Sequence, residues 1–66
     1  MINHLKLERA RCNLTQEQLA ERVGVSRQSI NSIEKNRYVP STILALKIAK
    51  ELRIRVESIF ELEECD

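Results

Sequence analysis

The stretch from Thr15 to Lys35, TQEQLAERVGVSRQSINSIEK, decides how the rest of the chain folds. Thr15 is a good residue to precede a helix, and Gln18 three positions later completes a capping box. Apolar residues then recur at helical spacing up to Gly24, a residue that can end a helix without a side-chain penalty. The first half of the stretch therefore predicts a short helix that stops at Gly24.

A second helix is predicted directly after this turn. Ser26 can cap it, and Ile30 and Ile33 give it a buried edge. Its outward face carries hydrogen-bonding side chains and no acid: Arg27, Gln28, Asn31 and Ser32. Two helices joined by a short glycine turn, the second with such a face, are typical of a helix-turn-helix that reads DNA.

These residues resemble, position by position, the helix-turn-helix of the Xre/Cro family, which includes the lambdoid phage repressors. The matching residues are Leu19, Ala20, Val23, Gly24, Val25, Ile30 and Ile33. The likeness continues through Ile33 to Asn36, Pro40-Ser41 and Leu46 to Leu52, so it covers nearly the whole chain. It is nearest to short single-domain members such as the cytolysin repressor.

The resemblance implies an all-α fold, a five-helix lambda-repressor-like bundle in one domain over residues 1–66. From the short members it also implies a small two-stranded antiparallel ribbon, formed by Met1 to Asn3 and Glu61 to Glu63. In the phage repressors an arginine matching Arg9 pairs with the glutamate matching Glu34. The resemblance therefore implies a structural ion pair between Arg9 and Glu34, and the alternative is two solvated charges.

The remaining helices are predicted from spacing. The first runs from about Asn3 to Cys12, with Leu5 and Ala10 as core positions and Leu7 or His4 beside them. Ser41 caps a fourth helix over Thr42 to Leu52, whose apolar stripe is Leu44, Ala45, Ile48, Ala49 and Leu52, widened by Leu46. A single-turn fifth helix fits Val56 to Phe60, although Arg55 is a poor cap.

The end of the chain holds more apolar side chains than one small core can take. A chain of 66 residues buries only about 60% of its unfolded surface, and binding a partner would stabilise it. We interpret the excess as the surface of a homodimer, formed by Ile54, Val56, Ile59, Phe60 and Leu62. For Ile59 and Phe60 the alternative is that they close the bottom of the bundle.

The DNA contacts are predicted from the position of each residue along the two helices. Arg27 and Gln28 begin the second helix, and the start of a recognition helix reaches deepest into the groove. The resemblance implies base reading by Arg27, Gln28 and Ser32, and Asn31 lies beside them. Phosphate contacts are expected from Gln16 and Ser26 at helix starts, and from the following loop residues Asn36, Arg37 and Tyr38. Tyr38 could instead pack under Pro40, and each of the others could be a solvated surface residue.

The charge balance agrees with contact to phosphate. Residues 1–38 hold seven lysines and arginines and four acidic residues, a net charge of +3. Residues 39–66 hold four lysines and arginines and six acidic residues, a net charge of −2. The positive excess therefore falls on the half that carries the helix-turn-helix.

Other classes of protein find little support. Cys12, Cys65 and the single histidine, His4, are not at metal-ligand spacing, so we expect no metal, no cofactor and no small-molecule ligand. The two cysteines are expected to be reduced thiols, with a redox switch as the alternative. No catalytic constellation, apolar run of ~20 residues or signal peptide is present, so we expect a cytosolic protein that is not an enzyme.

The sequence thus predicts a DNA-binding transcriptional regulator, a repressor that binds a palindromic operator as a homodimer through the helix Ser26–Lys35. The alternative is an antitoxin, or another protein-interaction module, whose main partner is a protein.

Overall fold

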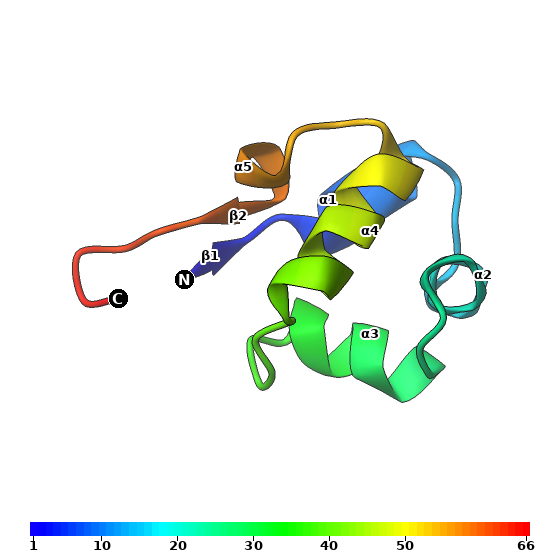
Figure 1. Ribbon diagram of the computed structural model, residues 1–66, viewed down its shortest axis with the longest axis horizontal. Helices are drawn as coiled ribbons and strands as arrows, with labels where there is room; N and C mark the ends of the chain where they lie inside the picture. The colour runs from blue at the N-terminus through cyan, green and yellow to red at the C-terminus, as the bar shows by residue number, and fades with distance from the viewer.

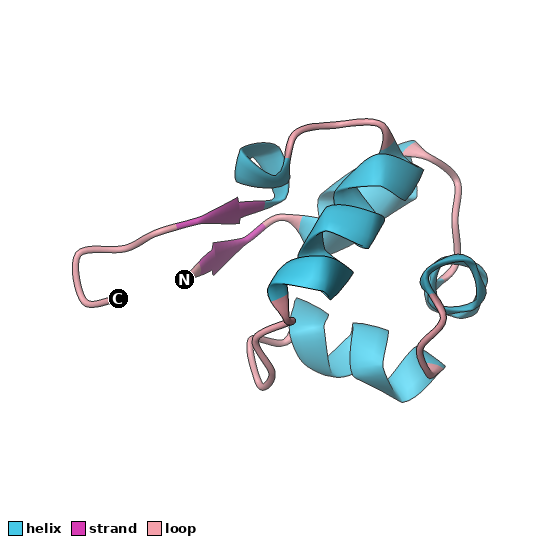
Figure 2. Ribbon diagram, viewed as in Figure 1, coloured by secondary structure: helices cyan, strands magenta, loops and turns pink.

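Five short helices and a two-stranded antiparallel ribbon make up the computed structural model, which describes all 66 residues (Figures 1 and 2). The all-α prediction with a ribbon from the chain ends is confirmed. No helix has the length and apolar character needed to cross a membrane. In chain order the elements are β1 (Ile2–Asn3), α1 (Leu5–Arg11), α2 (Gln16–Val23), α3 (Arg27–Glu34), α4 (Thr42–Leu52), α5 (Val56–Ile59) and β2 (Phe60–Glu61).

Local side-chain bonds set the ends of the helix-turn-helix. The Thr15 hydroxyl accepts from the Gln18 backbone N–H at 3.0 Å, and the Gln18 side-chain oxygen accepts from the Thr15 N–H at 2.8 Å. Gly24 ends α2 in the left-handed region at φ 76°. Ser26 and Ser41 cap α3 and α4 by accepting from the backbone N–H three residues later. These predicted caps and the glycine turn are confirmed.

The core lies where α2, α3 and α4 meet, closed by α1 and α5. Its twelve buried residues are all apolar. The predicted inward residues of the helix-turn-helix and of α4 are among them, except Ala45, which is half-buried. The twelve are Leu5, Leu14, Leu19, Ala20, Val23, Ile30, Ile33, Leu44, Ile48, Ala49, Leu52 and Ile59.

The first helix differs from its prediction in extent and in its inner face. It begins at Leu5, because Asn3 belongs to β1 and its side-chain oxygen caps the Leu5 N–H at 2.8 Å. Ala10, predicted for the core, is exposed. Leu5 and Arg9, one turn apart, face inward, which turns Ala10 outward by the geometry of a 3.6-residue helix.

The ribbon joins the two ends of the chain beside α5. Ile2 pairs with Glu61 and Asn3 with Phe60, so β2 starts one residue earlier than predicted. The fifth helix accordingly stops at Ile59, since Phe60 is already extended at φ −122°. The Met1 amino group contacts the Glu63 carboxylate at 2.7 Å. That contact, with a second to Asp66, raises the pKa of the amino group above its usual 8.0.

Arg9 connects α1 to the start of α2 and to the end of α3. Its Nε donates to Glu34 Oε2 at 2.7 Å and its Nη2 to Glu34 Oε1 at 3.2 Å. Its Nη1 donates to the Leu14 carbonyl at 2.7 Å. The Glu34 side chain is 4% exposed and that of Arg9 14%, so the ion pair is largely shielded from water. The pair implied by the family resemblance is present.

We predict that Arg9→Met lowers the free energy of unfolding by about 3 kcal/mol, because it leaves the Glu34 carboxylate buried without its counter-charge. Urea unfolding followed by circular dichroism measures this loss. Arg11→Met is the matched control on the same helix, since its pair with Glu8 is solvent-exposed on the arginine side and its loss should stay within about 1 kcal/mol. Equal losses in the two variants would contradict the prediction.

A second prediction concerns the end of α4. Arg53 lies in the left-handed region at φ 58°, where a Cβ atom is unfavourable. Arg53→Gly should therefore raise the free energy of unfolding by about 0.5–1 kcal/mol. Lys47→Gly provides the control, because Lys47 is an exposed residue in the interior of α4, where glycine is unfavourable and should lower stability. Thermal unfolding should show a higher midpoint for the first variant only.

Candidate nucleic-acid interface

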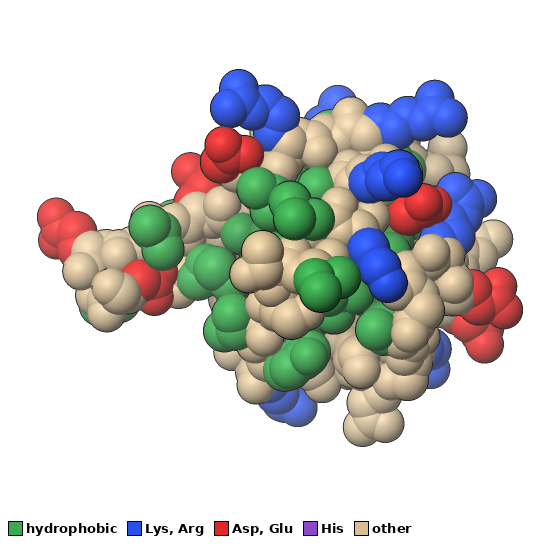
Figure 3. All heavy atoms as spheres, in the orientation of Figure 1, with side chains coloured by type: hydrophobic (Ala, Val, Ile, Leu, Met, Phe, Trp, Pro, Cys, Tyr) green, Lys and Arg blue, Asp and Glu red, His purple; other side chains and the backbone are tan.

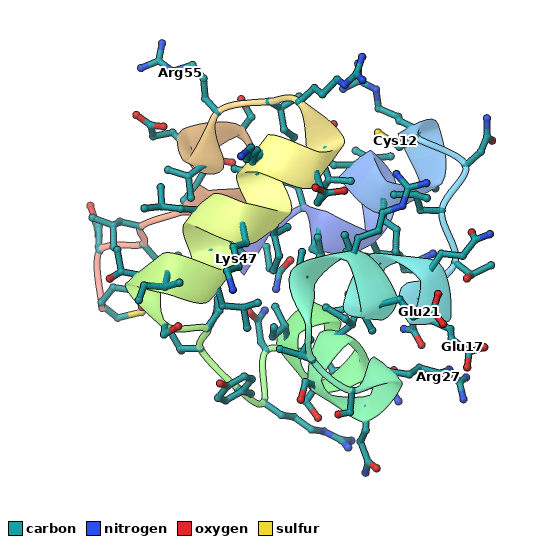
Figure 4. All side chains as sticks on the ribbon, turned by 45° about the vertical axis from the view of Figure 1, so that its right-hand side comes forward. Cys12, Glu17, Glu21, Arg27, Lys47 and Arg55 are labelled. Carbon is teal, nitrogen blue, oxygen red and sulfur yellow. The ribbon has the colours of Figure 1, made fainter.

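The outer face of α3 presents the predicted base-reading residues. Arg27 and Gln28 are exposed in the first turn, while Asn31 and Ser32 are half-buried one turn further on. Arg27 projects outward from the bundle at the lower edge of the molecule (Figure 4). Ile30 and Ile33, on the opposite side of the helix, are fully buried against the core.

Two polar hollows flank α3, so the helix stands as a ridge between them. The first, about 420 Å³, is lined by Ser26, Gln28, Ser29, Ser32, Arg37 and Tyr38. The second, about 630 Å³, is lined by Ser26, Arg27, Gln28, Asn31 and Lys35. All four predicted base-reading residues line one or both hollows. A polar helical ridge of this kind has the form that enters a major groove about 12 Å wide.

The predicted phosphate residues fall into two groups. Asn36, Arg37 and Tyr38 are exposed in the loop after α3, and Arg37 and Tyr38 line the first hollow. The Arg37 N–H donates to the Ser32 carbonyl at 2.9 Å, which ties this loop to the end of α3. Ser26 is exposed at the start of α3, where its hydroxyl accepts from the Ser29 N–H at 3.1 Å.

Gln16 has a structural contact that sequence reasoning missed. Its side-chain Nε2 donates to Glu34 Oε1 at 3.1 Å and to Asn31 Oδ1 at 3.3 Å. The Gln16 amide group therefore bonds to α3, and only the backbone end of α2 stays free to face a phosphate. No local signal marks this contact, since the partners lie 15 and 18 positions away.

The charge on this side of the molecule is positive. Arg27, Lys35 and Arg37 have no acidic partner within 4.0 Å, whereas Arg11, Arg22 and Arg55 each have one. A cluster of free cations with no acid on the outward face attracts phosphate. The positive charge is not confined to this side, because Lys47 and Lys50 are also exposed and unpaired on α4.

The exposed apolar surface of the chain coincides only in part with the predicted dimer surface. Ile59 is fully buried within its own chain, so it closes the bundle and offers a partner nothing. Ile54, Val56 and Phe60 are half-buried against the core, and Leu62 is exposed. The largest exposed apolar side chains near them are instead Val39, Ile43 and Leu46.

These residues surround an apolar hollow beside α4. It measures about 240 Å³ and is lined by Met1, Val39, Pro40, Thr42, Ala45, Leu46, Val56 and Phe60. We call the hollow, together with exposed Ile43, the α4 face. Apolar side chains gather over α4 in the space-filling view (Figure 3). The widened stripe at Leu46 and the apolar excess at Val56 and Phe60 were the sequence signals for this face. Nothing in the periodicity identified Val39 or Ile43.

Both cysteines are free thiols. Cys12 follows α1, where its sulfur lies 3.8 Å from the Leu52 carbonyl oxygen, and Cys65 lies in the exposed segment after β2. These two places are at opposite ends of the molecule (Figures 1 and 4). No disulfide joins the two cysteines within one chain.

Comparison with known proteins identifies the family to which this fold belongs. A family model described as helix-turn-helix matches residues 5–59. An uncharacterised HTH-type transcriptional regulator of Methanocaldococcus jannaschii is 55% identical over 64 residues, covering 97% of each chain. The uncharacterised HTH-type transcriptional regulator YgzD of Bacillus subtilis is 52% identical over 64 residues, again covering 97% of each chain.

A solved structure agrees as well. The restriction-modification controller protein C.AhdI from Aeromonas hydrophila superposes with a TM-score of 0.80 at 30% identity, covering 86% of each chain. The segment that the family model matches, residues 5–59, contains the helix-turn-helix, the buried ion pair and all of α4. The chain belongs to the helix-turn-helix family of DNA-binding transcriptional regulators, of the Xre type.

Proposed function

We propose that the protein is a cytosolic repressor that binds a palindromic operator as a homodimer, reading bases through Ser26–Lys35. The observation that carries the proposal is the outward face of α3, a ridge of hydrogen-bonding side chains without an acid between two polar hollows. Occupying an operator excludes other proteins from the same DNA, so the activity needs binding alone and no catalytic group.

Base reading is assigned from hydrogen-bonding capacity. Arg27 can donate two bonds to guanine O6 and N7, and Gln28 can bond adenine N6 and N7. Ser32 follows Gln28 by one helical turn on the same face, which brings it to a neighbouring base pair. Asn31 lines the hollow on the Arg27 side. Each well-made bidentate contact discriminates against a wrong base by roughly 1–3 kcal/mol.

Phosphate contacts would fix the register on either side of α3. The loop residues Asn36, Arg37 and Tyr38 follow the C-terminal end of α3 and would contact phosphates of one DNA strand. The N-terminal ends of α2 and α3, at Gln16 and Ser26, would direct backbone N–H groups toward phosphates of the other DNA strand. These contacts position the helix without reading sequence.

The α4 face is the surface we propose for the second copy. Leu46 protrudes beside the hollow that Pro40, Val56 and Phe60 line, so one surface offers both a projection and a recess. A two-fold interface needs this self-complementarity, because each copy presents the same patch. Of the predicted dimer surface, Val56 and Phe60 line this face. Ile54 and Leu62 remain in the proposal as half-buried and exposed positions outside the hollow, whereas Ile59, fully buried in its own chain, does not.

The direction of the two-fold axis follows from the arrangement of the two faces. In the view of Figure 1 α3 lies at the bottom, while the α4 face turns toward the viewer (Figure 3). A two-fold axis running vertically in that view would keep both copies of α3 at the bottom, so that one duplex could contact both. Recognition helices that enter successive turns of the same groove would be about 34 Å apart.

The base-reading assignment is tested by selecting binding sites from random duplexes and then titrating the best site in rising salt. Arg27→Ala should lose about 1–3 kcal/mol and relax preference at one position in each half-site. Arg37→Ala should weaken all duplexes alike and lower the salt slope by about 1. If Arg27→Ala weakened every sequence equally, Arg27 would be a phosphate contact instead.

The dimer surface is tested by placing a charge in it. Leu46→Glu should leave the protein monomeric in sedimentation velocity and weaken operator binding at least about tenfold, since a buried carboxylate without a partner is costly. Leu7→Glu is the matched control, because Leu7 is 60% exposed on α1 and Leu46 is 55% exposed on α4. A wild-type protein that occupies the operator as a monomer would remove the homodimer from the proposal.

A further inference from the structure

We propose that Gln16 of α2 fixes the orientation of the Asn31 side-chain amide, so that Asn31 turns its hydrogen-bond donor toward DNA and keeps its oxygen turned toward α2. Asn31 is then a base-reading residue of restricted preference, and Gln16 is a positioning residue that acts through it. The DNA half of this inference rests on the function proposed above, whereas the orientation of the amide does not.

The orientation begins at the buried ion pair. Arg9 donates to both oxygens of Glu34, which fixes the plane of the carboxylate. An ionised carboxylate can only accept hydrogen bonds. Any amide group that meets Glu34 Oε1 must therefore present its NH2 end.

Gln16 is the group that meets it. Its side-chain nitrogen lies 3.1 Å from Glu34 Oε1, so the oxygen of the Gln16 amide points away from α3. The same nitrogen lies 3.3 Å from the Asn31 amide. An NH2 group carries two N–H donors, and here one is directed to each partner. The Asn31 atom that faces Gln16 must accordingly be the oxygen.

Asn31 then has only its own NH2 group left for a ligand. That group has no partner within the protein, and Asn31 lines the polar hollow with Arg27, Gln28 and Lys35. A free asparagine recognises adenine with both its atoms, accepting from N6 and donating to N7. With the oxygen held toward α2, the Asn31 NH2 group suits bases that present an acceptor, which are guanine at O6 or N7, thymine at O4 and, through a single bond, adenine at N7. It is disfavoured opposite cytosine, which presents only an amino donor.

Gln28 provides an internal comparison. It is exposed on the same helix and makes no side-chain hydrogen bond within the protein, so both atoms of its amide can reach a base. The two amide residues of α3 thus differ in what they can read, and the difference originates in α2.

The orientation is tested on the free protein by nuclear magnetic resonance. Exchange of the side-chain NH2 protons with water should be slowed at Gln16, relative to Gln28, and should be fast at Asn31. Slowed exchange at Asn31 with fast exchange at Gln16 would overturn the inference. This measurement needs no DNA, so it decides the orientation whether or not the proposed function holds.

The consequence for DNA is tested by site selection with three variants. Wild type should disfavour cytosine about tenfold at one position of each half-site. Gln16→Met keeps the bulk of the side chain but removes both N–H groups, and the preference should move toward adenine as Asn31 becomes free to turn. Asn31→Asp keeps the bond from Gln16 and presents an acceptor, so the preference should move toward cytosine.

Glu21→Ala is the matched control, an exposed position of α2 without a bond to α3, and should select the wild-type site. Retention of the wild-type preference in both Gln16→Met and Asn31→Asp would overturn the role of Asn31 in reading. If the wild type selects no site, the proposed DNA-binding function fails, and the exchange measurement still reports on the amide. Unfolding curves of each variant show whether it is folded under the conditions of selection.

Discussion

The ion pair between Arg9 and Glu34 is the constraint on which the geometry of the surface depends. An eight-residue helix such as α3 is too short to be stable in isolation, and it relies on packing. Its buried residues, Ile30 and Ile33, attract it to the core but, because apolar attraction is non-directional, they only loosely fix its rotation. A bidentate arginine–carboxylate contact is directional. With a further bond to the Leu14 carbonyl, Arg9 fixes α3 relative to both α1 and the start of α2.

This role differs from a contribution to net stability. Apolar residues of similar size can replace a buried ion pair at little cost, because they avoid the desolvation of two charges. They could not hold Gln16, however, since Gln16 donates to the same carboxylate. The network continues from Glu34 through Gln16 to Asn31, and so from the interior to the outward face of α3. What the charges supply is therefore a defined orientation of polar groups at the surface.

The features that the sequence predicts well are local. The Thr15–Gln18 capping box, the turn at Gly24 and the cap at Ser41 each involve residues three or fewer positions apart, or a single backbone conformation. Helical spacing also predicted correctly which residues of α3 face away from the core. In short helices the phase is less certain, and the prediction for Ala10 was wrong because α1 has one strong apolar anchor, Leu5.

Contacts between distant segments could not be predicted from the pattern alone. The ribbon pairs Asn3 with Phe60, and a segment of two residues carries no periodicity. Arg9 and Glu34 are 25 positions apart, and only the family resemblance joined them. Neither the sequence pattern nor the family resemblance indicated the contact between Gln16 and Asn31. The apolar excess near the chain end was recognised, but the full set of exposed apolar residues was not, because the burial of Ile59 and the exposure of Val39 depend on how α4 and α5 pack.

The loop between α3 and α4 connects the two faces that the proposed function requires. Arg37 and Tyr38 line the hollow beside α3, whereas Val39 and Pro40 line the apolar hollow beside α4. This loop has little freedom, because Asn36 is left-handed at φ 58°, the Arg37 N–H bonds to the Ser32 carbonyl and Pro40 has a fixed φ. A second copy seated on the α4 face would therefore contact residues adjacent in the chain to those that meet phosphate. Dimer geometry and phosphate contact would be coupled through this stiff segment, so the spacing between operator half-sites should be narrowly defined.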